Sequence, residues 1–383
     1  MKKTPLFRIA GFKRLAIVLA LLAGAAVFLF AVLLLTLSIT EYRPAQIEAA
    51  HTALSNSRPD TQKMLPALDA GQTLRIVSWN IGYGGLGAKQ DFFMDDGTMV
   101  RPQNKAAVEE NLHGAAALMK RIDADMWFIQ EIDLKSMRSF YVDEAHVLSD
   151  ASALNGTYTY NFKCLFVPFP FPPLGRVASG LATFTNLDFT ESVRYALPVS
   201  FKWPVRMANL KRCLLVNRFP LTSGGELVAV NLHLEAYDEG EGKIAQTKAL
   251  IDFLKAEYDK GNYVVAGGDF NQTFPGLDLS AYPAHEGLWQ AAVMEQEALP
   301  PDWQFAADDK APSCRLNNGI YAEALNDENL RKNWQYYVID GFIVSPNVEI
   351  KSVHTLNENF IYADHNPVEI EVHLKKVYKN PSA

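Results

Sequence analysis

Apolar residues recur in short runs along most of the chain, and the character of these runs predicts its secondary structure. Many runs are nearly continuous and rich in valine, isoleucine and aromatic residues, as is typical of strands covered on both faces. Strands are predicted at residues 74–81, 126–132, 180–186, 213–219, 226–234, 263–270, 336–345 and 368–374.

Helical spacing of apolar residues appears between these runs. One stripe comprises Val108, Leu112, Ala115, Met119 and Ile122. A second comprises Ile244, Ile251, Leu254 and Tyr258, and is ended by Gly261. Each stripe fits one face of a helix, which we expect to pack against the core. Strands and helices mixed over ~300 residues predict an α/β domain whose sheets pack together beneath outer helices.

One apolar stretch is too long for a strand. Residues 15–39 contain no charged residue, and they exceed the ~20 residues that a helix needs to cross the hydrocarbon of a bilayer. Five basic residues precede the stretch, at positions 2, 3, 8, 13 and 14, whereas only Glu41 and Arg43 follow closely. This bias predicts a single pass through the plasma membrane with the N-terminus in the cytoplasm. A cleaved signal peptide is the alternative, but its apolar core usually spans only ~7–15 residues.

The charge of the chain is unevenly distributed. Residues 1–43 carry a formal charge of +5, so the total of −7 leaves residues 44–383 with −12. A surface that tracks nucleic-acid phosphates normally has a basic excess, so non-specific, high-affinity nucleic-acid binding is disfavoured. Cys164, Cys213 and Cys314 lie far apart without a CxxC pair. This spacing predicts core fillers rather than zinc ligands and leaves one disulfide open.

Polar residues stand where several predicted strands begin or end. The set comprises Asn80, Glu131, His233, Asp269, Asn271, Asp340, Asp364 and His365. Side chains at strand ends and in the adjoining loops can assemble a site on a rigid frame. We therefore expect these residues to share one site.

The residue types in this set fit metal-assisted hydrolysis of a phosphoester. Asn80 and Glu131 offer the hard oxygen ligands that Mg²⁺ or Mn²⁺ prefers. The two histidines can hold or release a proton near neutral pH, and the later aspartates can hold an imidazole in one tautomer. Asp269 or a histidine would activate water, and Asn271 would point at the same phosphate. We expect the glycines before Asp269 to let backbone and substrate approach closely.

Taken singly, these residues also have ordinary structural explanations. An Asp-Phe-Asn turn after a strand is typical of an Asx turn. Glu131 fits an exposed acid at a strand end, and His233 fits a hydrogen-bonded core histidine. Their joint occurrence in one chain is what favours a site.

The motifs "SWNIGYGG", "FIQEID", "VNLHLEA", "GGDFNQT", "IDGFIVS" and "YADHNPVEIEV" occur in this order. In sequence and spacing they resemble those of the endonuclease/exonuclease/phosphatase superfamily, which includes deoxyribonuclease I, abasic-site endonucleases, neutral sphingomyelinases and inositol polyphosphate 5-phosphatases. The resemblance covers about residues 74–374. It implies a four-layered α/β sandwich, in which two central mixed sheets are flanked by helices.

The resemblance also implies roles for individual residues. Glu131 matches the principal metal-binding glutamate, and Asn80 matches an asparagine near metal and phosphate. His233 matches a histidine that contacts phosphate or acts as an acid. Asp269 and Asn271 match the pair that positions water and phosphate. Asp340 matches the carboxylate that pairs with the terminal histidine, and Asp364 and His365 match the terminal Asp-His dyad.

Two positions bear on the subtype and on substrate binding. Abasic endonucleases carry an aspartate two residues after the first-motif asparagine, whereas this chain has Gly82. Arg176 and Ser179 lie where the superfamily has a Gly-rich strand near the substrate, so they are candidates for substrate binding.

The resemblance and the apolar stretch together suggest a division of the chain. Residues 1–14 form a cytoplasmic basic segment, 15–39 a transmembrane helix, 40–73 a stalk, 74–376 the catalytic domain and 377–383 a tail. Membrane contact is expected through the N-terminal helix, and no obligate protein partner is predicted.

The substrate remains open at the level of sequence. A membrane tether favours a phospholipid or sphingolipid head group, because confinement to a surface raises effective concentration. An exported nuclease acting on nucleic acid is the alternative. A catalytically inactive binding protein on the same fold is a third hypothesis, and retention of the full residue set argues against it. The segment "FVPFPFPP", residues 166–173, predicts a stiff loop whose aromatic residues touch a bilayer, stack on a base or pack beneath the loop.

Overall fold

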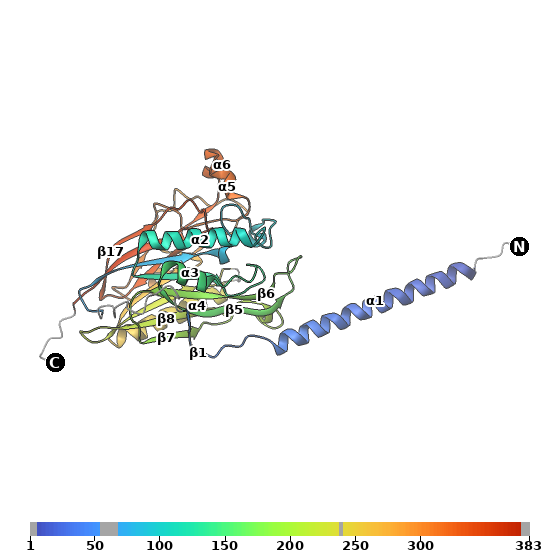
Figure 1. Ribbon diagram of the computed structural model, residues 1–383, viewed down its shortest axis with the longest axis horizontal. Helices are drawn as coiled ribbons and strands as arrows, with labels where there is room; N and C mark the ends of the chain where they lie inside the picture. Colours follow the sequence, from blue (N-terminus) through green and yellow to red (C-terminus); the bar gives the residue numbers. More distant parts are fainter. Residues whose placement is uncertain (1–5, 54–67, 237–239, 377–383) are drawn as a thin grey trace.

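Two seven-stranded sheets lie face to face at the centre of the molecule, and helices cover their outer faces (Figure 1). The computed structural model describes residues 6–53, 68–236 and 240–376. Each sheet is mixed, because β3 runs parallel to β4 and β9 runs parallel to β10, whereas the other pairs are antiparallel. The predicted four-layered α/β sandwich is therefore confirmed.

The first sheet has the order β17 (Val348–Thr355), β18 (Val368–Leu374), β3 (Thr73–Asn80), β4 (Met126–Asp133), β6 (Gly175–Thr185), β5 (Asn155–Val167) and β2 (His51–Ala53). The second has the order β1 (Ile47–Ala49), β7 (Glu191–Ala196), β8 (Cys213–Pro220), β9 (Glu226–His233), β10 (Tyr263–Asp269), β16 (Asp340–Val344) and β13 (Gln304–Ala306). Two small pairs join β11 (Gln272–Thr273) to β12 (Ala292–Val293) and β14 (Cys314–Arg315) to β15 (Tyr336–Tyr337).

The helices are α1 (Leu6–Ile39), α2 (Lys105–Ile122), α3 (Glu144–Ser152), α4 (Glu241–Asp259), α5 (Tyr321–Ala324) and α6 (Glu328–Lys332). Short 3₁₀ turns form η1 (Gly82–Gly84), η2 (Phe93–Asp95), η3 (Val205–Ala208) and η4 (Gln296–Ala298). Helix α2 is capped by Asn104, whose side chain accepts a hydrogen bond from the Ala107 backbone N–H and so satisfies one donor of the first turn.

Three apolar clusters hold the layers together. Side chains such as Ile76, Phe128 and Phe342 fill the space between the two sheets. The predicted stripe on α2 packs on the outer face of the first sheet, and α4 packs on the outer face of the second. Ile244 departs from its predicted core position and is 71% exposed, because Gln246 and Thr247 occupy the buried face at the start of α4.

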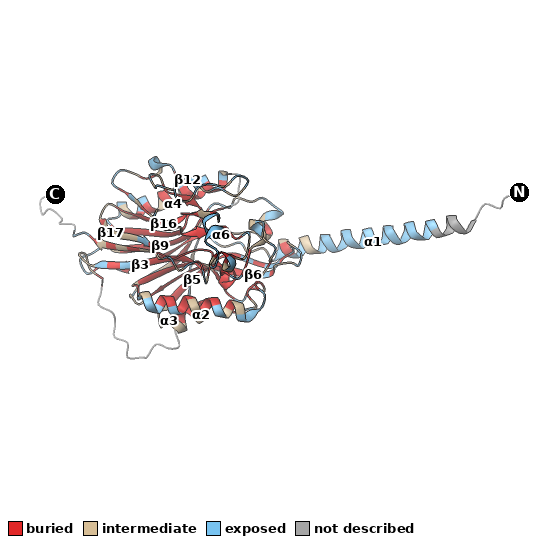
Figure 2. Cartoon of the chain, turned by 90° about the horizontal axis from the view of Figure 1, so that it is seen from above, coloured by how far each residue is buried: buried red, intermediate tan, exposed pale blue. Residues whose placement is uncertain are grey.

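Helix α1 projects away from the sandwich (Figure 2). Among the described residues it is the one helix that is long and apolar enough to cross a membrane, over Phe12–Ile39. Most of the side chains described along it are exposed, which is what a helix surrounded by lipid requires.

The segment predicted as a stalk differs in part from that expectation. Within residues 40–73, β1 pairs with β7 and β2 pairs with β5, so this segment adds an edge strand to each sheet. Residues 54–67 of the predicted stalk lie outside the described residues, as do the predicted tail and part of the N-terminal basic segment. The proline-rich segment is the turn of the β5–β6 hairpin, with β5 ending at Val167 and β6 beginning at Gly175.

Candidate active site

The sheets bring several of the predicted polar residues to one edge of the sandwich. Asn80 is the last residue of β3, His233 the last of β9 and Asp269 the last of β10. Asp340 is the first residue of β16, which runs antiparallel to β10. Asp269 consequently lies opposite His233 on one side and opposite Asp340 on the other.

Glu131 reaches this edge through an irregularity in β4. The pairing of β4 with β6 shifts register between Gln130 and Ile132, and the Glu131 backbone has a φ of 53°. This is a left-handed conformation that a non-glycine residue rarely adopts without local support. It aligns Glu131 with Asn80, whose Nδ2 donates to Glu131 Oε1 at 3.3 Å.

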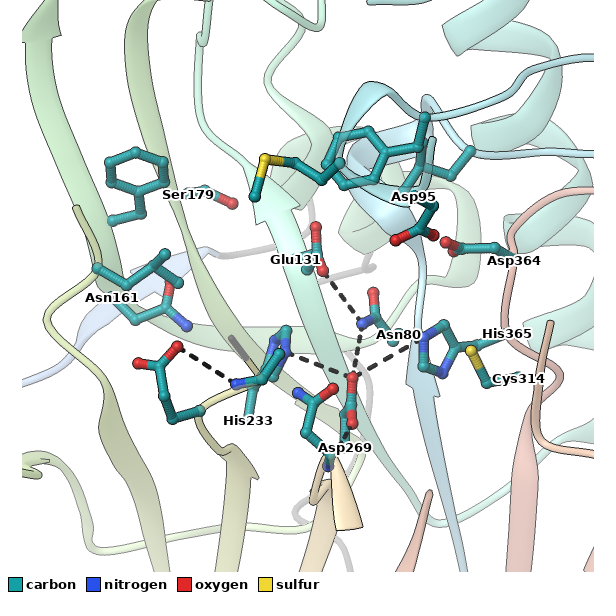
Figure 3. Close-up of a pocket in the computed structure, with 18 of the residues that line it drawn as sticks. Asn80, Asp95, Glu131, Asn161, Ser179, His233, Asp269, Cys314, Asp364 and His365 are labelled. Atoms are coloured by element: carbon teal, nitrogen blue, oxygen red, sulfur yellow. Dashed lines mark hydrogen bonds and ion pairs between the residues drawn. The ribbon is translucent and has the colours of Figure 1, made fainter. Parts of the chain in front are cut away.

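One carboxylate oxygen of Asp269 is the centre of the cluster (Figure 3). Asn80 Nδ2 donates to Asp269 Oδ2 at 3.1 Å. His233 Nε2 lies 3.3 Å from the same oxygen, and His365 Nε2 lies 3.8 Å from it. Burial, with the nearby Asp340 carboxylate, raises the pKa of Asp269 to about 7. This carboxyl is therefore placed to exchange a proton near neutral pH.

His365 is held by a buried carboxylate. Its Nδ1 lies 2.8 Å from Asp340 Oδ2, and Ser313 Oγ donates to the same Asp340 oxygen at 2.7 Å. Burial opposes protonation of the imidazole, but the Asp340 carboxylate outweighs it and raises the pKa of His365 well above its ordinary value. His365 therefore carries a proton at neutral pH.

His233 is in the opposite electrostatic situation. Burial, the Arg212 guanidinium and His365 lower its pKa well below the ordinary value for histidine. Its Nδ1 is buried and has no hydrogen-bond partner among the described residues. Two imidazoles with opposite pKa shifts thus face one carboxylate, so one is neutral and the other charged at the same pH.

The two glycines of the Gly-Gly-Asp-Phe-Asn stretch are needed for close packing against neighbouring strands. A Cβ on Gly267 would lie 2.4 Å from the Phe342 ring, and one on Gly268 would lie 1.9 Å from the Leu232 carbonyl oxygen. The expected close approach is therefore to neighbouring strands rather than to substrate. Asn271 has a φ of 50° and donates its backbone N–H to Asp269 Oδ1 at 2.9 Å, while its side-chain Nδ2 donates to the Leu234 carbonyl.

Asp364 lies on the other side of Asn80, and its carboxylate faces that of Asp95 from η2 (Figure 3). Asn317 Nδ2 donates to Asp364 Oδ2 at 3.3 Å, whereas Asp364 Oδ1 is buried without a hydrogen-bond partner among the described residues. Burial raises the pKa of Asp364 to about 7, and Glu131 and Asp95 contribute to the rise. The excess of negative charge beside Glu131 fits a bound cation.

A second group of metal-ligating atoms comes from Asp269, Asp340 and His365, which lie within 4.8 Å of one another. The Nδ1 of His365 is engaged with Asp340, and its raised pKa keeps the ring protonated. A protonated imidazole has no lone pair to offer a metal. The donor chemistry therefore favours Glu131 and Asn80 for the metal and leaves the second group as a proton network.

The cluster forms the floor of a cavity of about 420 Å³. One wall of the cavity is apolar and includes Phe162, Val167, Phe169, Leu174 and Leu210. A charged floor below an apolar wall fits a substrate that combines an anionic group with apolar parts.

The two residues predicted to bind substrate are placed differently. Ser179 lines the cavity and accepts a hydrogen bond from Arg138 Nη2 at 3.2 Å. Arg176 is exposed and does not line the cavity. Its neighbours on β6 turn alternately to the two faces of the sheet, and position 176 takes the outer face.

Three arginines line the cavity and were not predicted from the sequence: Arg138, Arg212 and Arg315. Arg138 makes two hydrogen bonds to Asp133 and stacks on the Tyr83 ring, with Cζ 3.7 Å from its centroid. Arg212 is buried, and its Nη1 donates to the His233 carbonyl at 3.3 Å. The signal for Arg212 was its place directly before a strand, since an antiparallel strand begins at the edge where its neighbour ends.

The three cysteines are free and buried, so the single disulfide that the sequence allowed is not formed. Cys314 lines the cavity beside His365. Burial raises the pKa of its thiol to about 12, so it is protonated and a poor nucleophile.

Comparisons with known proteins show the family and the fold of this chain. The model of a family described as the endonuclease/exonuclease/phosphatase family matches residues 77–365. An endonuclease/exonuclease/phosphatase from Beutenbergia cavernae shares the fold, with a TM-score of 0.53 and 16% identity over 79% of this chain and 72% of that one. Human nocturnin's catalytic domain, solved with bound sulfate, gives a TM-score of 0.47 and 15% identity over 80% and 95%. Truncated Caenorhabditis elegans TDP2 gives 0.46 and 13% over 79% and 99%. No curated protein sequence matched.

Proposed function

Because this chain belongs to the endonuclease/exonuclease/phosphatase family, whose members are metal-dependent hydrolases, we propose that it is a membrane-anchored phosphodiesterase. It acts outside the cytoplasm on a lipid head group or a similar phosphoester at a surface. Helix α1 supplies the anchor, and the basic residues before it favour a cytoplasmic N-terminus. Residues 74–376 carry the catalytic activity.

The observation that carries this proposal is the convergence of three nitrogens on Asp269 Oδ2. They belong to Asn80, His233 and His365, at 3.1, 3.3 and 3.8 Å. The Asp269 carboxylate can accept a proton from water, and the nitrogens beside it can donate to an anionic phosphate group, so the cluster offers both functions in one place.

Asp269 is the general base of the proposed reaction. A carboxylate whose pKa is near 7 accepts a proton from attacking water efficiently at neutral pH. The Asn271 backbone N–H and the Asn80 amide fix the orientation of the carboxylate. The attacking oxygen then forms a bond to phosphorus as the ester oxygen leaves.

The two histidines act on the phosphate rather than on the water. Protonated His365, held by Asp340, stabilises negative charge that develops on the phosphate oxygens. Neutral His233 donates one hydrogen bond to the same group. Asp364 faces Asp95 (Figure 3) and adds negative charge beside Glu131, where the ion would lie.

Glu131 and Asn80 are the residues that would hold the divalent ion, Mg²⁺ or Mn²⁺. When bound, the ion supplies Lewis-acid polarisation of the phosphate and neutralises charge on its oxygens. The hard oxygen donors and the surplus of carboxylates beside Glu131 support this position.

A nuclease of the same family is the second candidate. Phe93 and Phe169 meet edge to face at the cavity, with ring centroids 6.2 Å apart, and an aromatic side chain there can stack on a base. The acidic charge of residues 44–383 argues against extended binding of nucleic acid.

The test is turnover by the purified full chain in lipid nanodiscs with Mg²⁺. The substrates are a soluble phosphodiester, sphingomyelin and phospholipid bilayers, phosphoinositides, inositol phosphates, plasmid DNA and RNA. Asp269→Asn and His233→Ala are the controls that are expected to be inactive. We expect the native chain to release a phosphomonoester from a lipid substrate, and Asp269→Asn to cleave no substrate.

Other outcomes separate the alternatives. Cleavage of DNA or RNA in preference to lipid supports the nuclease. A folded chain that binds Mg²⁺ yet cleaves nothing revives the inactive binding protein.

A further inference from the structure

The last turns of α1 pack on the catalytic domain instead of standing free in front of it. Leu37 is buried, and Leu33 and Leu34 are partly buried. They contact a cluster that includes Val177 on β6 and Met207 on η3. The membrane helix and the domain therefore meet through an apolar interface.

Polar contacts fix the same junction. Trp203 Nε1 donates to Ser38 Oγ at 3.4 Å. The Glu41 side chain is only 2% exposed, and its Oε1 lies 3.0 Å from Arg206 Nε and 3.7 Å from Lys211 Nζ. Arg43 contacts the other carboxylate oxygen, and a buried carboxylate held by Arg206 and Lys211 of the domain resists rotation of the helix against it. We call these contacts of Ser38 and Glu41 the helix clamp.

The wall that α1 packs against is also the apolar wall of the active-site cavity. Five residues belong to both, namely Phe162, Val167, Leu174, Ala208 and Leu210. The helix therefore leaves the domain directly beside the cavity.

The length of α1 sets the height of this wall above the bilayer. The uncharged part of α1, residues 15–39, has 25 residues and is about 37 Å long at 1.5 Å per residue. The hydrocarbon is ~30 Å thick and takes ~20 residues. About five residues remain, and Leu37, the buried one of the three leucines, lies among them. The hydrocarbon therefore ends close to Leu34, and the cavity wall stands at the membrane surface.

Exposed apolar side chains lie at this level. Phe171 is 94% exposed and Phe169 67% exposed at the tip of the β5–β6 hairpin, which projects on the side from which α1 leaves (Figure 1). Leu165 on the hairpin and Trp203 before η3 are also exposed. Aromatic residues of this kind concentrate at membrane interfaces.

We propose that the hairpin tip and Trp203, oriented by the helix clamp, insert into the bilayer that holds α1, so that the cavity receives the phosphoester of a lipid still in the membrane. This inference rests on the proposed function for its substrate, but the docking of the rim does not. The occupant of the rim is the bilayer itself, because α1 enters it only a few residues from the same wall.

A fluorescent probe at the hairpin tip tests the docking. Phe171→Cys is labelled with an environment-sensitive fluorophore in nanodiscs that hold one chain each, and the three native cysteines are buried. The matched control is Val293→Cys on β12, which is 64% exposed and distant from α1 (Figure 2). We expect a blue-shifted probe at 171 that nitroxide-labelled acyl chains quench roughly twofold or more, and neither effect at 293.

A probe at 171 that is not quenched by nitroxide lipids overturns the docking, whatever the enzyme cleaves. A blue shift without such quenching means that the probe is covered by the protein and not by lipid, and it also overturns the docking.

Activity tests the second half of the proposal. In Leu165→Ser/Phe171→Ser we expect turnover of bilayer lipid to fall about tenfold, with hydrolysis of a soluble phosphodiester unchanged, and neither rate to change in Val293→Ser. Equal loss on both substrates contradicts lipid capture at the rim. A native chain that cleaves neither substrate removes the proposed function, while the probe result still decides the docking.

Discussion

His365 Nδ1 and Asp340 Oδ2 lie 2.8 Å apart in a buried site, although they belong to separate segments of the chain. Asp340 opens β16, and His365 precedes β18. Because β16 lies in one sheet and β18 in the other, this contact joins the two sheets at the edge where Asp269 ends β10.

Asp340→Asn removes the charge that keeps His365 protonated. We expect kcat to fall by about 10²–10³-fold at pH 7, because a neutral imidazole stabilises the transition-state charge less well. Steady-state kinetics measure this loss. Ser313→Ala is the control, since it leaves the Asp340 charge in place and removes only the hydroxyl that donates to it and accepts from two backbone N–H groups. Equal losses in the two variants would argue against a role for the charge.

The pH dependence of the rate follows from Asp269 and His365. Asp269 must lose its proton to act as the base, and its pKa is raised to about 7, so the rate rises as the pH passes about 7. The pKa of His233 is lowered, so this ring is already neutral over that range. The pKa of His365 is raised, so this ring loses its proton above the ordinary value, and the rate falls there. We expect a broad bell-shaped profile of kcat/KM at saturating Mg²⁺. In Asp340→Asn the descending limb should move to lower pH, which a merely structural defect would not produce.

Metal dependence tests the position given to the ion. EDTA should abolish turnover, and Mg²⁺ should restore it. Glu131→Gln should raise the Mg²⁺ concentration that gives half-maximal activity by about 10–100-fold, because it removes the charged donor. Glu349→Gln, an exposed acid on β17, is the control. Full activity in EDTA would rule out the role assigned to Glu131.

Much of the site was predictable because strand ends are visible in sequence. Asn80, His233 and Asp269 interrupt apolar runs at the point where the structure ends β3, β9 and β10. A buried strand cannot carry such residues in its middle without partners, so they mark its end.

The remaining features depend on partners far away in the chain. The edge strands within residues 47–53 are short and have no apolar pattern. They form strands only because they pair with β7 and β5, which are distant in the chain. β5 was not predicted as a strand because it is polar and aromatic, as is usual near the edge of a sheet. Asp95 reaches the site from a loop whose path no local pattern encodes. The helix clamp at Glu41 likewise requires Arg206, which local sequence does not connect to it.

We expect Arg212 to contribute to phosphate binding and Arg176 not to contribute. Arg212 is buried at the cavity beside His233, whereas Arg176 is exposed outside it. A guanidinium binds phosphate through two parallel hydrogen bonds that an ammonium cannot copy. We therefore expect Arg212→Lys to raise KM about tenfold with a smaller change in kcat, and Arg176→Lys to change neither. A rise in KM in Arg176→Lys alone would return phosphate binding to the residue that the sequence indicated.

Substitution of Glu41 allows the coupling between α1 and the active site to be broken without touching the cavity. Glu41→Gln removes the charge that holds Arg206 and Lys211, and burial then disfavours the charged form of the Lys211 ammonium, whose pKa is already lowered. The junction should loosen, and the cavity should lose its fixed orientation to the bilayer. We expect hydrolysis of a soluble phosphodiester to stay at the native rate and turnover of bilayer lipid to fall about threefold to tenfold, with weaker nitroxide quenching of a probe at position 171. Glu349→Gln, an acid of similar size on the far strand β17, should change none of these readouts. If lipid turnover in Glu41→Gln equals that of the native chain, α1 only tethers the domain, and the helix clamp does not orient the cavity towards the lipid.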